Sequence, residues 1–247
     1  NPAAIWKSKK DFRKVLSMFS LMASVQISKK TYANRSKKVG IYFNPIPLRR
    51  ENEEIVSTAV TSRNSLYFNR LEAKYGGQID VNYSRNRTLL TTGFENRQLQ
   101  SYGTTWRWNI IKPLFTQVGY TYGIKANQSD FFKNLRYQFS YHDAFTEIAY
   151  QHQTQIRVSA KYELSFKNNP NDSVGTQTGR VHRVSLDARY NRTAKTTITS
   201  NLSYATVLYN DRNFNNQQLE FAMLEGLQSG SNLVWSVGIE QILTNNI

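Results

Sequence analysis

Apolar and polar residues alternate along most of this chain. The alternation is clearest over residues 155–167, where the apolar members are Ile156, Val158, Ala160, Tyr162, Leu164 and Phe166. A period of two is typical of a β-strand with one face in apolar surroundings and the other in water. The same pattern recurs at 15–28, 78–84, 101–110, 114–125, 134–142, 183–191, 198–208 and 233–239. With a less regular segment at 55–69, the sequence predicts an all-β, antiparallel fold of about ten strands.

The length of these strands and the position of their aromatic residues favour a membrane as the apolar surroundings. The strands extend over roughly 10–16 residues, longer than the ~5–6 of most strands, and a bilayer requires ~9–11 tilted residues. Aromatic residues make up 13% of the chain, and Tyr and Trp recur near the ends of the apolar faces. The polar faces are rich in Arg, Lys, Gln and Asn, as a water-filled interior permits. We therefore expect a transmembrane β-barrel in the outer membrane of a Gram-negative bacterium, rather than a soluble β-sandwich.

The connections alternate between long and short. Long connections are expected at 29–54, 86–100, 126–133, 168–182 and 210–230, and short ones at 70–77, 112–113, 151–154 and 192–195. Bacterial barrels carry long loops outside the cell and short turns on the periplasmic side. The alternation requires one long strand over 134–150, with a bulge near 143–145. Residues 1–247 then form a single barrel segment, incomplete at its C-terminus, and we expect at least two further strands because lipid does not tolerate an open sheet edge.

Positive charge is concentrated in the first 50 residues. They hold twelve Lys or Arg and one Asp, a net charge of +11 out of the chain's +15. Residues 29–54 are accordingly predicted to form a long basic extracellular loop that contacts lipid phosphates, such as those of lipopolysaccharide, or a partner protein of the cell envelope. The candidate contact residues are Lys29, Lys30, Arg35, Lys37, Lys38, Arg49 and Arg50. Nucleic acid is not an expected partner, because the chain lacks an aromatic RNA-binding signature.

A second set of cations has the parity of the predicted barrel interior. These candidate lumen cations are Arg107, Arg136, Arg157, Lys161, Arg183 and Arg189. A ring of such residues would favour the passage of anions. However, the acidic residues Asp80, Glu163, Asp187 and Glu240 share the same parity, so a network of cross-strand ion pairs is equally consistent with the sequence.

No residue pattern indicates catalysis. The chain has three His and no Cys, and it contains neither an HExxH motif nor a phosphate-binding Gly-rich loop, so no enzyme activity, metal or cofactor is expected. The alternative is a lipid-modifying barrel enzyme in which Ser140 is the nucleophile and His142 the base. The alternation assigns both residues to the lumen instead, and no orienting acid is identifiable.

Three stretches resemble a known group of proteins. They are residues 89–97 (LLTTGFENR), 190–195 (YNRTAK) and 223–232 (MLEGLQSGSN), the last followed by Trp235. Over residues 60–247 the chain resembles the C-terminal barrel region of large, mostly uncharacterised outer-membrane β-barrel proteins of Bacteroidota. The resemblance implies that two more strands follow, and it implies no catalytic residue. The expected function is a structural or transport role, porin-like or as a subunit of a multi-protein envelope complex; a soluble β-sandwich that binds polyanions is a further alternative.

Overall fold

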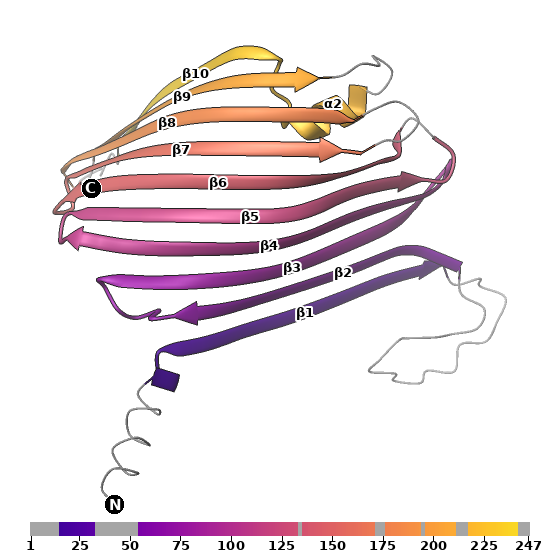
Figure 1. The fold of residues 1–247 in the computed structure, drawn as a ribbon, viewed down its shortest axis with the longest axis horizontal. Coiled ribbons are helices and arrows are strands. Elements are labelled where there is room, and N and C mark those ends of the chain that lie inside the picture. The colour runs from indigo at the N-terminus through magenta and orange to yellow at the C-terminus, as the bar shows by residue number, and fades with distance from the viewer. Residues whose placement is uncertain are drawn as a thin grey trace, which may run out of the picture.

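A computed structural model describes residues 15–32, 54–132, 135–170, 176–193, 196–210 and 217–241. Within these residues, ten antiparallel strands form one sheet in which each strand pairs with its neighbours in the chain (Figure 1). The strands are β1 (Phe19–Tyr32), β2 (Glu54–Phe68), β3 (Tyr75–Leu90), β4 (Gly93–Ile111), β5 (Leu114–Ser129), β6 (Tyr137–His152), β7 (Ile156–Asn169), β8 (Gln177–Thr193), β9 (Thr196–Asn210) and β10 (Gly230–Gln241). The expected all-β, antiparallel fold with ten strands is confirmed.

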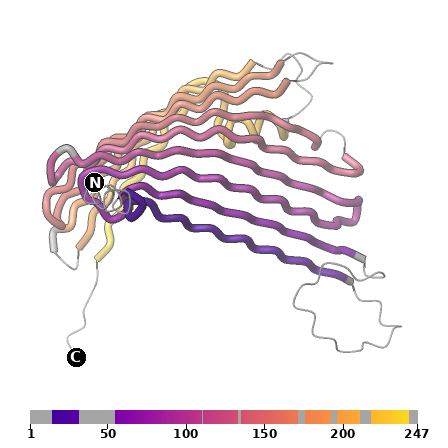
Figure 2. The backbone as a smooth tube through the Cα atoms, turned by 60° about the horizontal axis from the view of Figure 1, so that its bottom comes forward, coloured from indigo at the N-terminus to yellow at the C-terminus, as the bar shows by residue number. Residues whose placement is uncertain are grey.

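The sheet is strongly curved, and one short helix lies on its concave side (Figure 2). This helix, α2 (Gln217–Leu224), belongs to the connection between β9 and β10. The described part of the chain contains one sheet, without the second sheet that a β-sandwich requires. Among the described helices, none is long and apolar enough to cross a membrane. The two edges of the sheet are β1 and β10.

The two faces of the sheet differ in chemistry. Large apolar side chains on the convex face are exposed, such as Leu21 at 73%, Trp235 at 69% and Trp108 at 64%. The concave face carries most of the charged side chains, together with the small apolar clusters beneath α2. A soluble protein rarely exposes a continuous apolar surface of this extent. We call this surface the apolar belt. It consists of the apolar outward-facing residues of all ten strands, and it extends from Phe19–Ile27 on β1 to Leu233–Ile239 on β10.

The apolar belt crosses the strands obliquely. In the strand register, Phe19 of β1 lies in the same row as Phe68, Trp106, Tyr162 and Leu233. Phe19 is nevertheless at one margin of the belt, whereas Leu233 is at the opposite margin. Between β1 and β10, nine strand spacings apart, the centre of the belt therefore shifts by about seven residues along the strand direction. With ~3.3 Å per residue and ~4.8 Å between strands, this shift corresponds to a tilt of about 30° between the strands and the normal to the belt. Barrel strands tilt by a similar angle, typically 35–45°.

The connection between β3 and β4 is shorter than predicted. A long loop was expected over 86–100, but β3 continues to Leu90 and β4 begins at Gly93, so that only Thr91 and Thr92 remain in the turn. The φ of +110° at Gly93 allows the chain to reverse there. The prediction was wrong because Arg, Asn and Gln occupy both faces of these strands beyond the apolar belt, which removes the alternation that marked the strands elsewhere.

The phase of the first half of β6 also differs from the prediction. Tyr137, Phe139 and Tyr141 were expected on the apolar outer face, but the register pairs them with Asn127, Lys125 and Gly123 on the concave face. The expected bulge at 143–145 is absent, and β6 pairs continuously with both neighbours. Apolar side chains are tolerated on this part of the concave face because α2 covers it; Phe139, for example, packs beneath α2.

Two glycines of β5 make room for aromatic side chains of β6 on this concave face. A Cβ atom at Gly123 would collide with the ring of Tyr141 and would lie 2.6 Å from the carbonyl oxygen of Gln100. A Cβ atom at Gly119 would collide with the ring of Phe145. The aromatic rings therefore lie directly over the glycine backbone, and this close approach pins the register of β5 against β6.

Candidate functional site

Helix α2 packs against the concave face of β6, β8 and β9. Its buried side chains are Leu219, Met223 and Leu224, which contact two clusters on the sheet. The first cluster is Phe139 with its neighbouring tyrosines, and the second is Val181, Ala205 and Val207. Leu219 and Met223 are four residues apart and therefore lie on one side of the helix.

The helix ends in a left-handed turn that projects a carboxylate towards the sheet. Glu225 and Gly226 have φ values of +57° and +77°, and the Gly226 amide donates a 3.1 Å hydrogen bond to the Phe221 carbonyl oxygen. This bond spans five residues, as in the Schellman motif that ends many helices. Farther along, the Asn232 side chain donates a 2.8 Å bond to the Gln228 carbonyl oxygen and accepts one from the Gln228 amide at 3.3 Å. Residues 223–232, one of the three stretches that carry the resemblance, therefore shape the return from α2 into β10.

Five charged side chains join α2 to β7 and β8, and we call them the anchor network. Glu225 accepts from Lys167 Nζ at 2.7 Å and from Arg183 Nη2 at 3.4 Å. Arg183 also donates to Glu163 at 3.2 Å, and Glu163 accepts from Lys161 Nζ at 2.6 Å. The network therefore links three cations through two carboxylates across two strands and the end of the helix.

Burial makes the Glu225–Lys167 pair the central contact of the anchor network. The Lys167 side chain is only 4% exposed, whereas that of Glu225 is 46% exposed. Burial opposes ionisation of Glu225, but the hydrogen bond and charge of Lys167, together with Arg183, outweigh it and hold the pKa of Glu225 below its usual value. An ammonium group as buried as that of Lys167 requires an ionised partner, which Glu225 supplies.

The candidate lumen cations make different contacts in the structure. Lys161 and Arg183 belong to the anchor network, and Arg157 and Arg189 lie on the same concave face. Arg107 also lies on this face, where its Nη2 donates to the carbonyl oxygens of Asn69, Arg70 and Glu72 at 2.9, 2.7 and 2.8 Å. Arg107 therefore closes the β2–β3 turn and is not free to contact a permeating anion.

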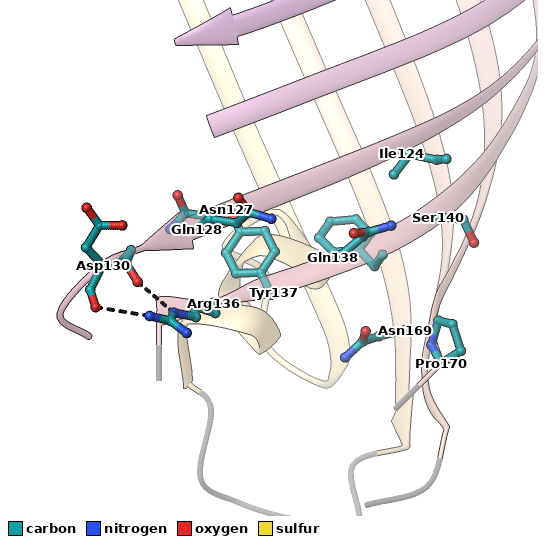
Figure 3. A pocket seen from close by; sticks show the side chains of 12 residues that line it. Ile124, Asn127, Gln128, Asp130, Arg136, Tyr137, Gln138, Ser140, Asn169 and Pro170 are labelled. Carbon is teal, nitrogen blue, oxygen red and sulfur yellow. Dashed lines mark hydrogen bonds between the residues drawn. The ribbon is translucent and has the colours of Figure 1, made fainter. Parts of the chain in front are cut away.

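Arg136 does not belong to this group of concave cations. It precedes β6, and its guanidinium donates to the carbonyl oxygens of Ser129 at 2.6 Å and Asp130 at 3.0 Å. Figure 3 shows Arg136 clamping the β5–β6 connection at the rim of an open pocket of about 770 Å³. Tyr137 and Asn127 line the same side of this pocket, and Asn169 and Pro170 line the other. Arg136 lies before the first paired residue of β6, so the strand register assigns it to neither face, and the parity argument that grouped it with the lumen cations does not apply to it.

The acidic residues confirm the predicted parity. Asp80, Glu163, Asp187 and Glu240 all lie on the concave face in the register. Asp80 accepts from Ser65 at 2.6 Å and from the Gln78 amide at 2.6 Å. Of the two arrangements left open by the sequence, cross-strand pairing therefore describes Arg183, which bonds Glu163 of the neighbouring strand, better than a ring of free cations. Lys161 is also paired, but with Glu163 within its own strand.

Two of the predicted contact residues of the basic loop are described. Lys29 and Lys30 lie within β1, not in a loop, because β1 extends to Tyr32. Lys29 lies on the convex face opposite Thr58, and Lys30 lies on the concave face opposite Ser57. The other candidates, Arg35, Lys37, Lys38, Arg49 and Arg50, lie outside the described residues.

Ser140 and His142 lie on the convex face, contrary to the lumen assignment. His142 is in register with Tyr122 and Phe166, and its Nδ1 is hydrogen-bonded to the Tyr120 hydroxyl at 2.7 Å. The Ser140 hydroxyl donates to the carbonyl oxygen of Asn168 at 3.4 Å. In the alternative mechanism Ser140 is the nucleophile and His142 the base, but each of them is hydrogen-bonded to a different residue.

The sequence did not reveal α2, Lys167 or Glu225 as parts of a site. Residues 217–226 do carry a signal: helix-forming residues, Leu219 and Met223 four apart, and Gly226 just after the last turn. Lys167 alternates correctly with its neighbours, but nothing local reveals that its partner is Glu225, 58 residues away. Within the described ranges, no group of three or more His, Cys, Asp or Glu could hold a metal ion.

No protein-family model matches this chain, and no curated protein sequence matches it. Among solved structures, the translocator domain of autotransporter NalP from Neisseria meningitidis aligns with 99% of this chain and 88% of that chain. The identity is 10% and the TM-score is 0.34. A likeness this distant decides neither fold nor function, so both depend on the residues of this chain.

Proposed function

We propose that the chain forms part of the wall of an outer-membrane β-barrel, with its convex face in lipid and its concave face towards the interior. The observation that carries this proposal is the distribution of carboxylates. Every strand Asp or Glu whose side chain is described lies on the concave face: Asp80, Glu95, Asp143, Glu147, Glu163, Asp187 and Glu240. The convex face instead carries the exposed apolar belt. A charged side chain on a lipid-facing strand position is destabilising, most strongly near the bilayer midplane, so lipid accounts for both halves of this asymmetry.

The interior of this barrel is narrowed by α2. The helix occupies the concave face over β6, β8 and β9, and the anchor network holds its C-terminal end. This arrangement favours a structural role, or transport that requires α2 to move, over an open general pore. The free edges of β1 and β10 must also be paired in a membrane, by further strands or by a partner protein of the envelope.

Cysteine accessibility tests the orientation directly, because the chain contains no natural Cys. Trp235→Cys and Ser236→Cys introduce one thiol each on adjacent residues of β10, on the convex and concave faces respectively. In outer-membrane vesicles of cells expressing the protein, a water-soluble maleimide should label position 236 and spare position 235. Equal labelling at both positions, or recovery of the protein in the soluble fraction without detergent, would contradict the proposal.

A lipid-modifying enzyme is the second candidate function. Ser140 and His142 lie on the convex face, where such an enzyme would meet its substrate. Their hydrogen bonds to Asn168 and Tyr120 argue against a nucleophile–base pair. The purified protein in mixed detergent–phospholipid micelles should release no fatty acid; release that disappears in His142→Ala would establish the enzyme instead.

A further inference from the structure

We infer that the convex face of β1 and β3 binds the phosphate groups of an anionic membrane lipid through Lys29, Arg85 and Arg87. This inference rests on the proposed membrane location and adds a partner to it. These three residues lie near the end of the sheet that carries the β1–β2, β3–β4, β5–β6, β7–β8 and β9–β10 connections, which we call the loop end. We call the three residues the basic patch.

The register brings the basic patch together. Lys29 is opposite Thr58 of β2, and Thr58 is opposite Arg87 of β3, so that Lys29 and Arg87 lie in one row two strands apart. Two strand spacings correspond to about 10 Å. Arg85 is two residues from Arg87 and therefore points to the same side. Three cations within this distance repel one another unless an anion joins them.

The described side chains around the basic patch do not neutralise it. Arg85 Nε donates to the amide oxygen of Asn96 at 3.1 Å, and the Arg87 guanidinium lies 4.0 Å from the centre of the Phe94 ring. Both contacts orient a guanidinium without cancelling its charge. Some cations of the concave face do have carboxylate partners: Arg97 pairs with Glu95 at 3.0 Å, and Arg183 pairs with Glu163 and Glu225.

The position of the basic patch fits the headgroup layer. On β3, Ile79, Val81 and Tyr83 belong to the apolar belt, and Arg85 and Arg87 follow at the next two outward positions. On β1, Lys29 follows Ile27 in the same way. Among the strand residues whose side chains are described, the convex face carries one further Lys or Arg, Arg180 of β8, again near the loop end. Cations directly beyond an apolar belt meet the lipid phosphates rather than the acyl chains.

The occupant is therefore a lipid and not a soluble anion. A free phosphate would need only the positive charges of the basic patch for binding. The basic patch, however, borders directly on the exposed apolar belt, which would contact the acyl chains of a lipid whose phosphate groups bind the patch. Bisphosphorylated lipid A combines both chemistries and is the probe for the test.

The experiment is a titration of the full chain in neutral detergent with lipid A, with bound lipid measured by native mass spectrometry. Each Lys or Arg near an anionic surface corresponds to about fivefold in affinity. The triple variant Lys29→Gln, Arg85→Gln, Arg87→Gln should therefore weaken binding at least tenfold, and Arg87→Gln alone about fivefold. The matched control, Arg97→Gln, Arg157→Gln, Arg189→Gln, removes the same charge from the concave face and should change binding less than twofold. Inorganic phosphate at millimolar concentration should not displace the lipid, and dephosphorylated lipid A should bind as weakly as lipid A binds to the triple variant.

Lipid A binding that is equal in the triple variant and the parent would overturn the inference, as would equal losses in the triple variant and its control. Displacement by inorganic phosphate at millimolar concentration would identify a soluble-anion site instead. These outcomes are distinguishable from failure of the proposed function, because the labelling contrast between positions 235 and 236 reports the membrane location independently. The single Arg87→Gln variant provides the comparison if the triple variant does not fold.

Discussion

Loss of the Glu225 carboxylate should release helix α2 from the sheet while leaving the strands intact. Glu225→Gln removes the charge that lies 2.7 Å from Lys167 Nζ and 3.4 Å from Arg183. Removing one partner of a fully buried ion pair costs about 3–5 kcal/mol. The buried member here is Lys167, but Glu225 is 46% exposed, so a value nearer that of a charged hydrogen bond, about 2 kcal/mol, is appropriate.

This destabilisation should appear locally. A loss of about 2 kcal/mol in docking corresponds to a roughly 30-fold increase in the population of released helix, and amide hydrogen exchange in α2 should accelerate by the same factor. Exchange in β7 and β8 should not change. Glu240→Gln is the matched control, because Glu240 lies on the same concave face of β10, away from the anchor network. Unchanged exchange in α2 of the Glu225 variant, or equal acceleration in both variants, would refute the role assigned to the anchor network.

Three further outcomes are expected. The folded-state pKa of Glu225 lies below its usual 4.5, so its contribution to docking is complete above pH 4.5 and is lost as the pH falls from there through the folded-state pKa. Hydrogen exchange in α2, corrected for its intrinsic rate, should therefore rise as the pH falls below about 4.5 and should not change above it. Gly119→Ala should lower the free energy of unfolding by about 1–3 kcal/mol in urea titrations, because the added methyl group collides with the Phe145 ring, and the same substitution in a Phe145→Ala background should cost much less. Trp235→Arg should destabilise the membrane-inserted protein by about 2–4 kcal/mol, whereas Ser236→Arg on the concave side should be nearly neutral in the same titration.

The sequence predicted the fold well wherever one side of a strand is apolar and the other polar. β7 is the best example, since Ile156 to Phe166 alternate without exception and the strand extends over Ile156–Asn169. The prediction was wrong where both faces have the same polarity. The loop-end halves of β3 and β4 are polar on both faces, so their sequence predicts a loop. The first half of β6 presents aromatic side chains to the interior, which local alternation assigns to the outside.

The candidate site was less accessible from the sequence. The alternation of residues correctly predicted that Lys161 and Arg183 share a face with Glu163, because the face on which a residue lies depends only on its position within its own strand. Pairing is not local: the anchor network also requires Glu225, which reaches the sheet only because α2 folds back across it. The aromatic residues that parity misassigned, Phe139 in particular, are those that α2 covers. A tertiary contact from a distant connection thus accounts for both the missed residues and the inverted phase.

The strict chain order of the sheet has a consequence for assembly. Each strand pairs only with the strands before and after it in the chain, so the wall consists entirely of consecutive hairpins and can grow by adding one hairpin at a time. Loop closure is inexpensive at each addition because the joined segments are adjacent in sequence. A partly assembled sheet of this kind has two edges, and each edge is the template on which the strand next to it in the chain can align.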